Sequence, residues 1–192
     1  MLPRLGTSKL VTNWLLITLG ASVANALGGG WLASWAALAP SRILRGEVWR
    51  LVTWPLIEVG PMALIFTCVA IYKFGGELAI RWGDVRLRRF MLEIVVGAGV
   101  ATCLLAAIAG ATYMRRLGGW AVADVLVIAW ARQFPDRSLV LYGLLTLRGQ
   151  QLINITVGAA ILFAIYFGPI AMAPELIACA AAALYPTERL RY

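Results

Sequence analysis

Apolar residues run in long stretches along this chain, separated by short segments that contain charges, Gly or Pro. The six most apolar stretches cover approximately residues 11–31, 61–82, 90–113, 118–133, 151–167 and 170–185. A helix needs about 20 mostly apolar residues to cross a bilayer. The pattern therefore predicts an all-α polytopic membrane protein, with a single domain of six transmembrane helices over residues 1–192.

Two of these stretches carry further signals. The fourth is short and closes at Phe134-Pro135-Asp136, which indicates a helix surrounded by other helices rather than by lipid. The fifth is also compatible with an earlier start, at Leu139. We take residues 151–167 as its apolar part.

The third stretch is preceded by a basic segment and contains small residues. Gly83-Asp84 and the arginines after it predict a hinge before a helix at 90–113. Small residues recur there at about four-residue spacing, which lets helix backbones approach closely. These residues are Gly97, Ala101, Ala106 and Gly110.

Residues 32–60 mix aromatic and charged side chains instead of forming an apolar run. Glu47, Trp49, Arg50 and Trp54 lie in this segment. Aromatic and charged residues together are typical of the membrane–water interface. We therefore expect a partly membrane-embedded first loop that contains short helices.

The composition agrees with a membrane protein. Hydrophobic residues make up 61% of the chain and charged residues 14%, against about 25% charged residues in a typical soluble domain. The net charge of +8 comes from fifteen Arg and two Lys against nine acidic residues. Since most cations flank the apolar runs, we interpret them as topology signals and expect no nucleic-acid partner.

The distribution of these cations predicts an orientation. Six crossings with the N-terminus inside place eleven of them on the cytoplasmic side and five on the other side. This agrees with the positive-inside rule, so both termini are expected in the cytoplasm. The excess of Arg over Lys, the Ala-rich helices and the short loops favour a bacterial cytoplasmic (inner) membrane.

Cysteine and histidine usage argues against a metal or cofactor. Cys68, Cys103 and Cys179 lie in separate apolar runs without a CxxC grouping, and the chain has no histidine. Disulfide, zinc and haem sites therefore lack support, and we expect no cofactor.

Four ionisable residues are predicted at membrane depth. Lys73 and Glu77 lie four residues apart, so on one helix they share a face and can neutralise each other. Asp124 and Glu175 are far apart in sequence but could face each other across the bundle. Two such carboxylates can share a proton, bind a cation, or simply fix helix packing through hydrogen bonds; we favour the packing role.

Two motifs resemble those of the rhomboid superfamily: GEVWRLVT at 46–53, in the first loop, and GGELAIRWG at 75–83, ending the second crossing. The residues that carry them are Glu47, Trp49, Arg50, Gly75, Gly76, Glu77 and Gly83. The resemblance implies a bundle of six helices with a first loop submerged in one leaflet. It extends weakly to about residue 150. It assigns Trp49 and Arg50 a structural role, with the ring at the interface and the guanidinium on loop carbonyls.

The same resemblance implies that the catalytic residues of rhomboid proteases are missing. Counting back from Phe134 brings the family's Gly-x-Ser-Gly motif onto residues 118–121, so Trp120 stands in the place of the serine. The histidine of the family's dyad has no counterpart. Ala63 and Thr67 stand where the family often has oxyanion-stabilising His and Asn. An indole has only an N–H donor and no attacking oxygen, so we expect a protein without enzymatic activity.

Three functions follow from these observations. The first is a non-catalytic rhomboid-like protein that binds transmembrane helices of other proteins, as an adaptor or as a subunit of a hetero-oligomeric membrane complex. The second is a small transporter or ion conductor that uses Lys73, Glu77, Asp124 and Glu175. The third is a residual intramembrane hydrolase. We favour the first over the hydrolase because both members of the dyad are missing. We favour it over the transporter because the sequence has no convincing internal repeat and no matched pair of broken helices.

Overall fold

The chain folds mainly into helices, as the apolar pattern predicts. The structure is a computed structural model that describes residues 8–141 and 145–186. Its helices are α1 (Lys9–Leu27), α2 (Trp31–Ala36), α3 (Pro40–Ile43), α4 (Arg50–Thr53), the 3₁₀ turn η1 (Trp54–Leu56), α5 (Pro61–Ala70), the π-helical turn η2 (Ile71–Gly75), α6 (Gly76–Trp82), α7 (Asp84–Ile108), α8 (Trp120–Gln133), α9 (Gly149–Phe167) and α10 (Ala173–Leu184). Two strands, β1 (Ser138–Leu141) and β2 (Leu145–Arg148), pair antiparallel.

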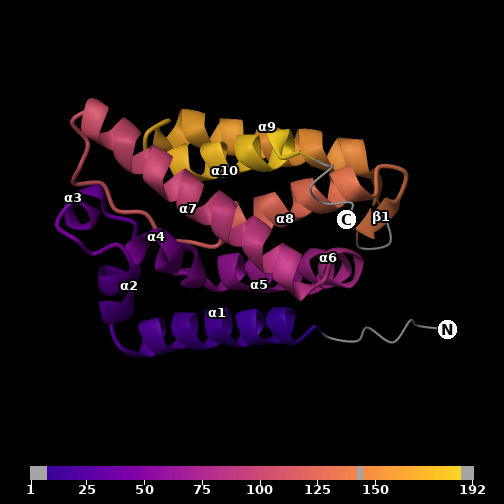
Figure 1. Cartoon of the computed structure of the whole chain (residues 1–192), viewed down its shortest axis with the longest axis horizontal. Helices are drawn as coiled ribbons and strands as arrows, with labels where there is room; N and C mark the ends of the chain where they lie inside the picture. Colours follow the sequence, from indigo (N-terminus) through magenta and orange to yellow (C-terminus); the bar gives the residue numbers. More distant parts are fainter. Residues whose placement is uncertain (1–7, 142–144, 187–192) are drawn as a thin grey trace.

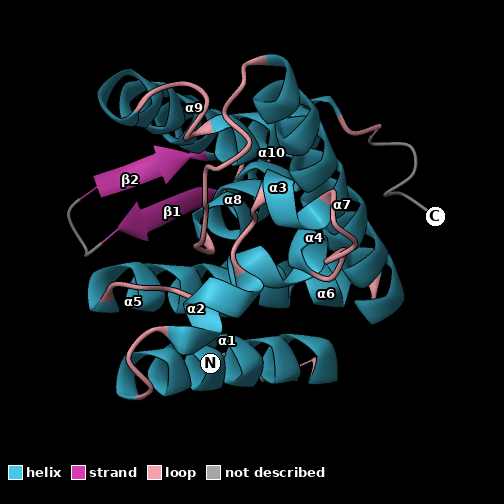
Figure 2. Ribbon diagram, turned by 90° about the vertical axis from the view of Figure 1, so that its left-hand side faces the viewer, coloured by secondary structure: helices cyan, strands magenta, loops and turns pink. Residues whose placement is uncertain are grey.

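The longer helices lie side by side and form a bundle (Figure 1). The segments α5, η2 and α6 continue as one helix, Pro61–Trp82. The short helices α2, α3 and α4 gather at one end of the bundle, and the β1–β2 hairpin lies at the opposite end. Figure 2 looks along the long axis of this bundle and shows α1 along one outer edge and α9 on the opposite edge.

Helix α8 lies at the centre of this bundle. It packs against α10, α9, α5 and η2, and nine of its 14 residues are buried. The buried members include Val125, Leu126 and Ile128, each 0% exposed. A short helix enclosed by others was predicted for this segment, and the packing confirms it.

Helix α7 begins at Asp84, six residues before the predicted start at 90, and ends at Ile108 rather than 113. Gly83 has φ +82°, which turns the chain sharply enough that a new helix starts directly after α6. The basic residues expected in a hinge therefore lie in the first turns of α7. Gly110, with φ +68°, follows the helix end instead of lying inside it.

The close backbone approach on α7 is at Gly99 rather than at the predicted small residues. A Cβ on Gly99 would lie 3.1 Å from Leu51 and 3.4 Å from Leu38. Gly97 faces open space, and of the predicted set only Ala106 is buried. The spacing was correct for a helix, but the sequence does not show which face the first loop covers.

The remaining ends differ by a few residues from the predicted ones. Helix α1 ends at Leu27, before the Gly28–Gly30 turn, and α10 covers Ala173–Leu184. Helix α9 begins at Gly149, so the earlier start at Leu139 is wrong. The residues before it form strands, in which Leu139 pairs with Leu147.

Four helical segments are long and apolar enough to cross a membrane within the described residues: Lys9–Leu27, Pro61–Trp82, Asp84–Ile108 and Gly149–Phe167. Only 17% to 44% of the residues in their most apolar windows are buried inside the protein. The apolar remainder suits lipid. Helices α8 and α10 have 14 and 12 residues, so the count of six crossings stays a prediction.

Substitution of Gly149 tests the contact between the start of α9 and the end of α8. A Cβ there would lie 2.9 Å from the Ala131 carbonyl oxygen and 3.1 Å from that of Phe134. We expect Gly149→Ala to lower the stability by about 1–3 kcal/mol, because backbone must move to make room. The measurement is thermal unfolding of the purified protein in detergent.

Gly158→Ala is the matched control on the same helix, since nothing lies within 4 Å of its Cβ position. It should leave the unfolding temperature unchanged or raise it slightly, because Ala favours a helix over Gly. Equal unfolding temperatures for both variants would contradict the close approach.

Candidate functional site

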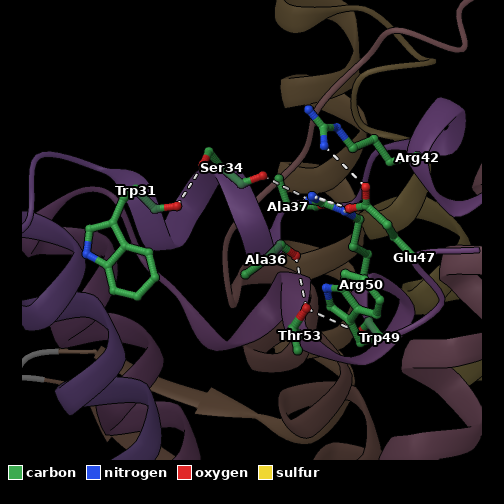
Figure 3. Close-up of polar contacts among 9 residues, drawn as sticks. All are labelled: Trp31, Ser34, Ala36, Ala37, Arg42, Glu47, Trp49, Arg50 and Thr53. Atoms are coloured by element: carbon green, nitrogen blue, oxygen red, sulfur yellow. Dashed lines mark hydrogen bonds and ion pairs between the residues drawn. The ribbon is translucent and has the colours of Figure 1, made fainter.

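A buried arginine organises the first loop. The Arg50 guanidinium is 1% exposed and donates from Nη1 to the carbonyl oxygens of Ser34 (3.0 Å) and Ala37 (2.9 Å). Its Nε and Nη2 both lie 2.6 Å from Glu47 Oε2 (Figure 3). The Arg50 side chain therefore joins α4 to the end of α2, and the guanidinium bonds loop carbonyls as expected.

Further contacts fix the same loop. Glu47 also accepts from Arg42 at 3.2 Å, and the hydrogen bond from Arg50 lowers the pKa of the Glu47 carboxyl. The Thr53 hydroxyl donates to the Ala36 carbonyl at 3.1 Å. Trp49 stacks on Trp35 with ring centroids 5.5 Å apart, and both rings are partly exposed. Partly exposed indoles suit an interface between water and lipid.

Glu58, which follows this loop, anchors the start of α8. Its Oε1 accepts from the Thr67 hydroxyl at 2.6 Å and from the Gly119 backbone N–H at 2.7 Å. A Cβ on Gly119 would lie 2.6 Å from Thr67, so the backbone approaches closely here. Burial raises the pKa of the Glu58 carboxyl despite these hydrogen bonds.

Trp120 is the first residue of α8 and lies between two other helices. Its ring is 6.1 Å from Phe66 of α5 and 6.5 Å from Phe163 of α9, measured between centroids. The three side chains are 38%, 46% and 43% exposed. The indole therefore fills the space between α5 and α9 at the end of the bundle where the first loop lies.

A cavity of about 400 Å³ opens beside Trp120. Its wall comes from residues that start α5, α8 and α10 and end α9, all at the same end of the bundle. The lining residues are Glu58, Val59, Gly60, Ala63, Arg116, Leu117, Trp120, Asp124, Ala159, Ala160, Phe163, Phe167, Met172 and Glu175.

Asp124 and Glu175, predicted to face each other across the bundle, both line this cavity. Glu175 is 1% exposed, and its Oε1 accepts from Arg116 Nε at 2.8 Å and pairs with Nη2 at 2.7 Å. The Asp124 carboxylate lies 3.8 Å from the Cys179 thiol. The structure thus gives each carboxylate a neighbouring donor, as the packing role requires.

Lys73 and Glu77 form a separate polar cluster, as their spacing predicts. Their charged atoms are 2.9 Å apart. Glu77 also accepts from Trp130 Nε1 at 2.7 Å and from Arg137 Nη1 at 3.1 Å. Trp130 belongs to the last turn of α8, so this cluster lies about two helical turns from Asp124 along that helix.

Of the three glycines in the second motif, Gly83 is the one whose conformation favours glycine. Gly83 has the positive φ that separates α6 from α7. Gly75 is buried, and a Cβ there would lie 3.8 Å from Leu126 and 3.9 Å from Val11, which are ordinary contact distances. Gly76 has open space at its Cβ position.

The absence of a metal and of a cofactor stays a prediction. Within residues 8–141 and 145–186, no three Cys, Asp or Glu side chains are grouped as metal ligands. Asp124 and Glu175 alone provide too few ligands for a closed zinc site, which usually has four.

The sequence analysis missed Glu58. The signal for Glu58 was available: it is the one carboxylate in the apolar run between Trp54 and Pro61. Its partners Thr67 and Gly119 are 9 and 61 residues away in the chain, and the second separation is not visible in a sequence pattern.

The fold and the site define a helical integral membrane protein with a first loop held by a buried arginine and a cavity at one end. The chain belongs to the eukaryotic integral membrane protein family DUF1751, whose model matches residues 8–185. None of the curated protein sequences matches it significantly. The family match confirms that the chain is an integral membrane protein.

The expected bacterial cytoplasmic membrane is wrong, because the family is one of eukaryotic integral membrane proteins. The cations flank apolar helices as the positive-inside rule requires. This rule applies to many kinds of membrane, so it does not identify a bacterial one. The prediction that both termini are cytoplasmic involves residues 1–7 and 187–192, which lie outside the described residues.

Replacement of Arg50 by Lys tests the first-loop anchor. A lysine keeps the charge but cannot bond Glu47 and the two carbonyls together. We expect Arg50→Lys to lower the free energy of unfolding by about 1–3 kcal/mol, measured by thermal or denaturant unfolding in detergent. Arg42→Lys is the control: its side chain is 49% exposed, so the cost should stay below about 1 kcal/mol. A larger loss for Arg42→Lys would contradict the assignment.

Proposed function

We propose that this protein is a non-catalytic, rhomboid-like membrane protein that binds transmembrane helices of partner proteins, as an adaptor or as a subunit of a larger membrane complex. In this proposal, α1, the α5–α6 segment, α7, α8, α9 and α10 are the six crossings. The order of these elements and the position of the first loop before the second crossing support the resemblance.

The observation that carries the proposal is Trp120. The rhomboid resemblance places it at the nucleophile position, and its ring fills the gap between α5 and α9. Serine catalysis needs a hydroxyl with a base within hydrogen-bond reach. Residue 120 offers no hydroxyl, and the chain contains no histidine.

Thr67 and Glu58 could replace the missing nucleophile and base, but their burial argues against a residual hydrolase. Thr67 donates to Glu58 at 2.6 Å, which has the geometry of a nucleophile and a base. However, Thr67 is 0% exposed and Glu58 is 5% exposed. A peptide bond cannot reach this hydroxyl unless the helices separate.

Ion transport receives less support from the arrangement of charges. Lys73 and Glu77 form one cluster, and Asp124 and Glu175 belong to another. Along α8, the two clusters lie at Asp124 and at Trp130. The residues between them include Leu126 and Ile128, which are apolar and 0% exposed. A conducting path would need polar groups or water along this length.

The exposed face of α1 is suited to a partner helix. Gly20 and Ala24 are exposed and lie four residues apart, and nothing lies within 4 Å of the Gly20 Cβ position. Small residues at this spacing let two helices pack closely in lipid. Only 22% of the apolar window of α1 is buried in the protein, so the face is available.

The absence of proteolysis can be tested with a fluorophosphonate serine probe and a transmembrane substrate. We expect neither labelling nor cleavage, and Trp120→Ser should add a hydroxyl without adding activity because no histidine can activate it. An active rhomboid protease in the same membranes is the positive control. Probe labelling or cleavage by the unaltered chain would refute the non-catalytic assignment.

Partner binding can be tested by photo-cross-linking in native membranes with a photoreactive residue at Ala24. We expect protein adducts, and Gly20→Leu should reduce them at least about tenfold by holding the helices apart. Gly97→Leu makes the same change on α7, where Gly97 is also open, and should leave the adducts unchanged. The absence of protein adducts, or equal loss in both variants, would refute helix binding at α1.

A fixed stoichiometry of this protein and its partner after purification would indicate a subunit of a complex. Exchange among several partner proteins would indicate an adaptor.

A further inference from the structure

The cavity beside Trp120 contains a buried carboxylate oxygen without a partner. Glu175 is 1% exposed, and its Oε1 accepts both contacts from Arg116. Its Oε2 is buried and has no hydrogen-bond partner among the described residues. A buried charged oxygen is costly unless it is paired. Since Glu175 lines the cavity, a cation or donor from a ligand could satisfy this oxygen.

A second carboxylate and a guanidinium line the same space. Glu58 is 5% exposed and uses Oε1 for both of its hydrogen bonds. Arg116 is 26% exposed and bonds Glu175 and Met172 through Nε and Nη2. Its Nη1 has no partner in the part of the chain that the structure describes. The cavity therefore presents groups for a positive and a negative charge together.

Aromatic rings line the side of the cavity toward the outer surface of the bundle. Trp120 and Phe163 lie 6.5 Å apart, and Phe163 and Phe167 lie 6.0 Å apart. Tryptophan is the strongest partner in cation–π contacts, and aromatic walls with acidic groups are typical of sites for quaternary ammonium ions. Phe163 and Phe167 are 43% and 64% exposed, so the wall continues onto the apolar outer surface of α9.

The position and size of the cavity suit a lipid headgroup. It lies where α8 and α10 begin and α9 ends, beside the first loop with its partly exposed Trp35 and Trp49. This is the end of the bundle expected at the interface depth. Its volume of about 400 Å³ lies in the range of small-molecule sites. A side chain or a headgroup fits this space, whereas a helix about 10 Å wide would have to displace its walls.

We propose that this cavity binds the zwitterionic headgroup of a choline phospholipid. The trimethylammonium group lies against Trp120 near Glu58 and Glu175, the phosphate pairs with Arg116, and the acyl chains leave along the exposed face of α9. The cavity offers Arg116 to the phosphate, and it offers the buried Glu58 and Glu175, the half-buried Asp124 and an aromatic wall to the ammonium group. The site does not depend on binding of a partner helix, since the lipid contacts this chain alone.

Native mass spectrometry of the delipidated protein in detergent tests this proposal. Phosphatidylcholine and phosphatidylglycerol with the same acyl chains are added separately, because the second lipid keeps the phosphate and lacks the ammonium. We expect one phosphatidylcholine to be retained per chain, with at least about tenfold higher affinity than phosphatidylglycerol. Soluble phosphocholine is a third arm, and competition by it at equal concentration would assign the site to a free headgroup and overturn the phospholipid proposal.

Two variants assign the retained lipid to the cavity. Glu175→Gln removes the buried charge, and Trp120→Leu removes the aromatic face at a partly exposed position. Each should lower phosphatidylcholine retention by about tenfold. Asp136→Asn makes the same carboxylate-to-amide change at an exposed residue at the far end of α8 and should have no effect.

Two further results would overturn the proposal. The first is equal retention of both lipids by the unaltered protein. The second is unchanged phosphatidylcholine retention in both Trp120→Leu and Glu175→Gln, with each variant verified as folded by its unfolding temperature.

Discussion

The arrangement of this protein depends on shielding a helix that is too short to cross a membrane alone. Helix α8 has 14 residues, or about 21 Å at 1.5 Å per residue, against about 30 Å of hydrocarbon. The backbone N–H and C=O groups left unpaired at its two ends must therefore find hydrogen-bond partners within the protein. At its start, the N–H groups of Gly118 and Gly119 donate to the Trp54 carbonyl and to Glu58. At its end, the Phe134 N–H donates to the Trp130 carbonyl, and the Arg132 side chain donates to carbonyls at the end of α10.

The same constraint explains where the polar groups lie. The first loop covers the start of α8, and it can do so because the buried Arg50 satisfies loop carbonyls that would otherwise be unpaired away from water. Glu58 at the end of that loop and Glu175 at the start of α10 reach the same place. Trp120 then stands with its ring partly exposed at the start of α8, where Glu58, Arg116 and Glu175 meet. The result is a cavity with charged groups of both signs and aromatic walls. Since the proposed partner helix binds to α1, this cavity remains free for a small ligand.

The sequence predicted what depends on local spacing and little of what depends on distant pairing. The apolar runs located the helices, and the Lys73–Glu77 pair followed from a four-residue separation. The start of α7 was missed because one positive φ at Gly83 decides it. The hairpin was missed because its strands are only four residues each, too short to outweigh a neighbouring helical pattern. Glu58 was missed because its partner Gly119 comes from another helix. The type of membrane was wrong because charge placement reports orientation, not the organism.

The most direct test of this account asks whether α8 crosses the membrane. Single cysteines at Arg115 and Asp136, both exposed and on either side of α8, would be introduced after replacement of Cys68, Cys103 and Cys179. An impermeant thiol reagent is then added to sealed vesicles of known orientation. The account predicts that only one of the two positions reacts from outside, and that the other reacts only after permeabilisation. Labelling of both positions from the same side would contradict a central, membrane-crossing α8 and the six-helix arrangement built around it.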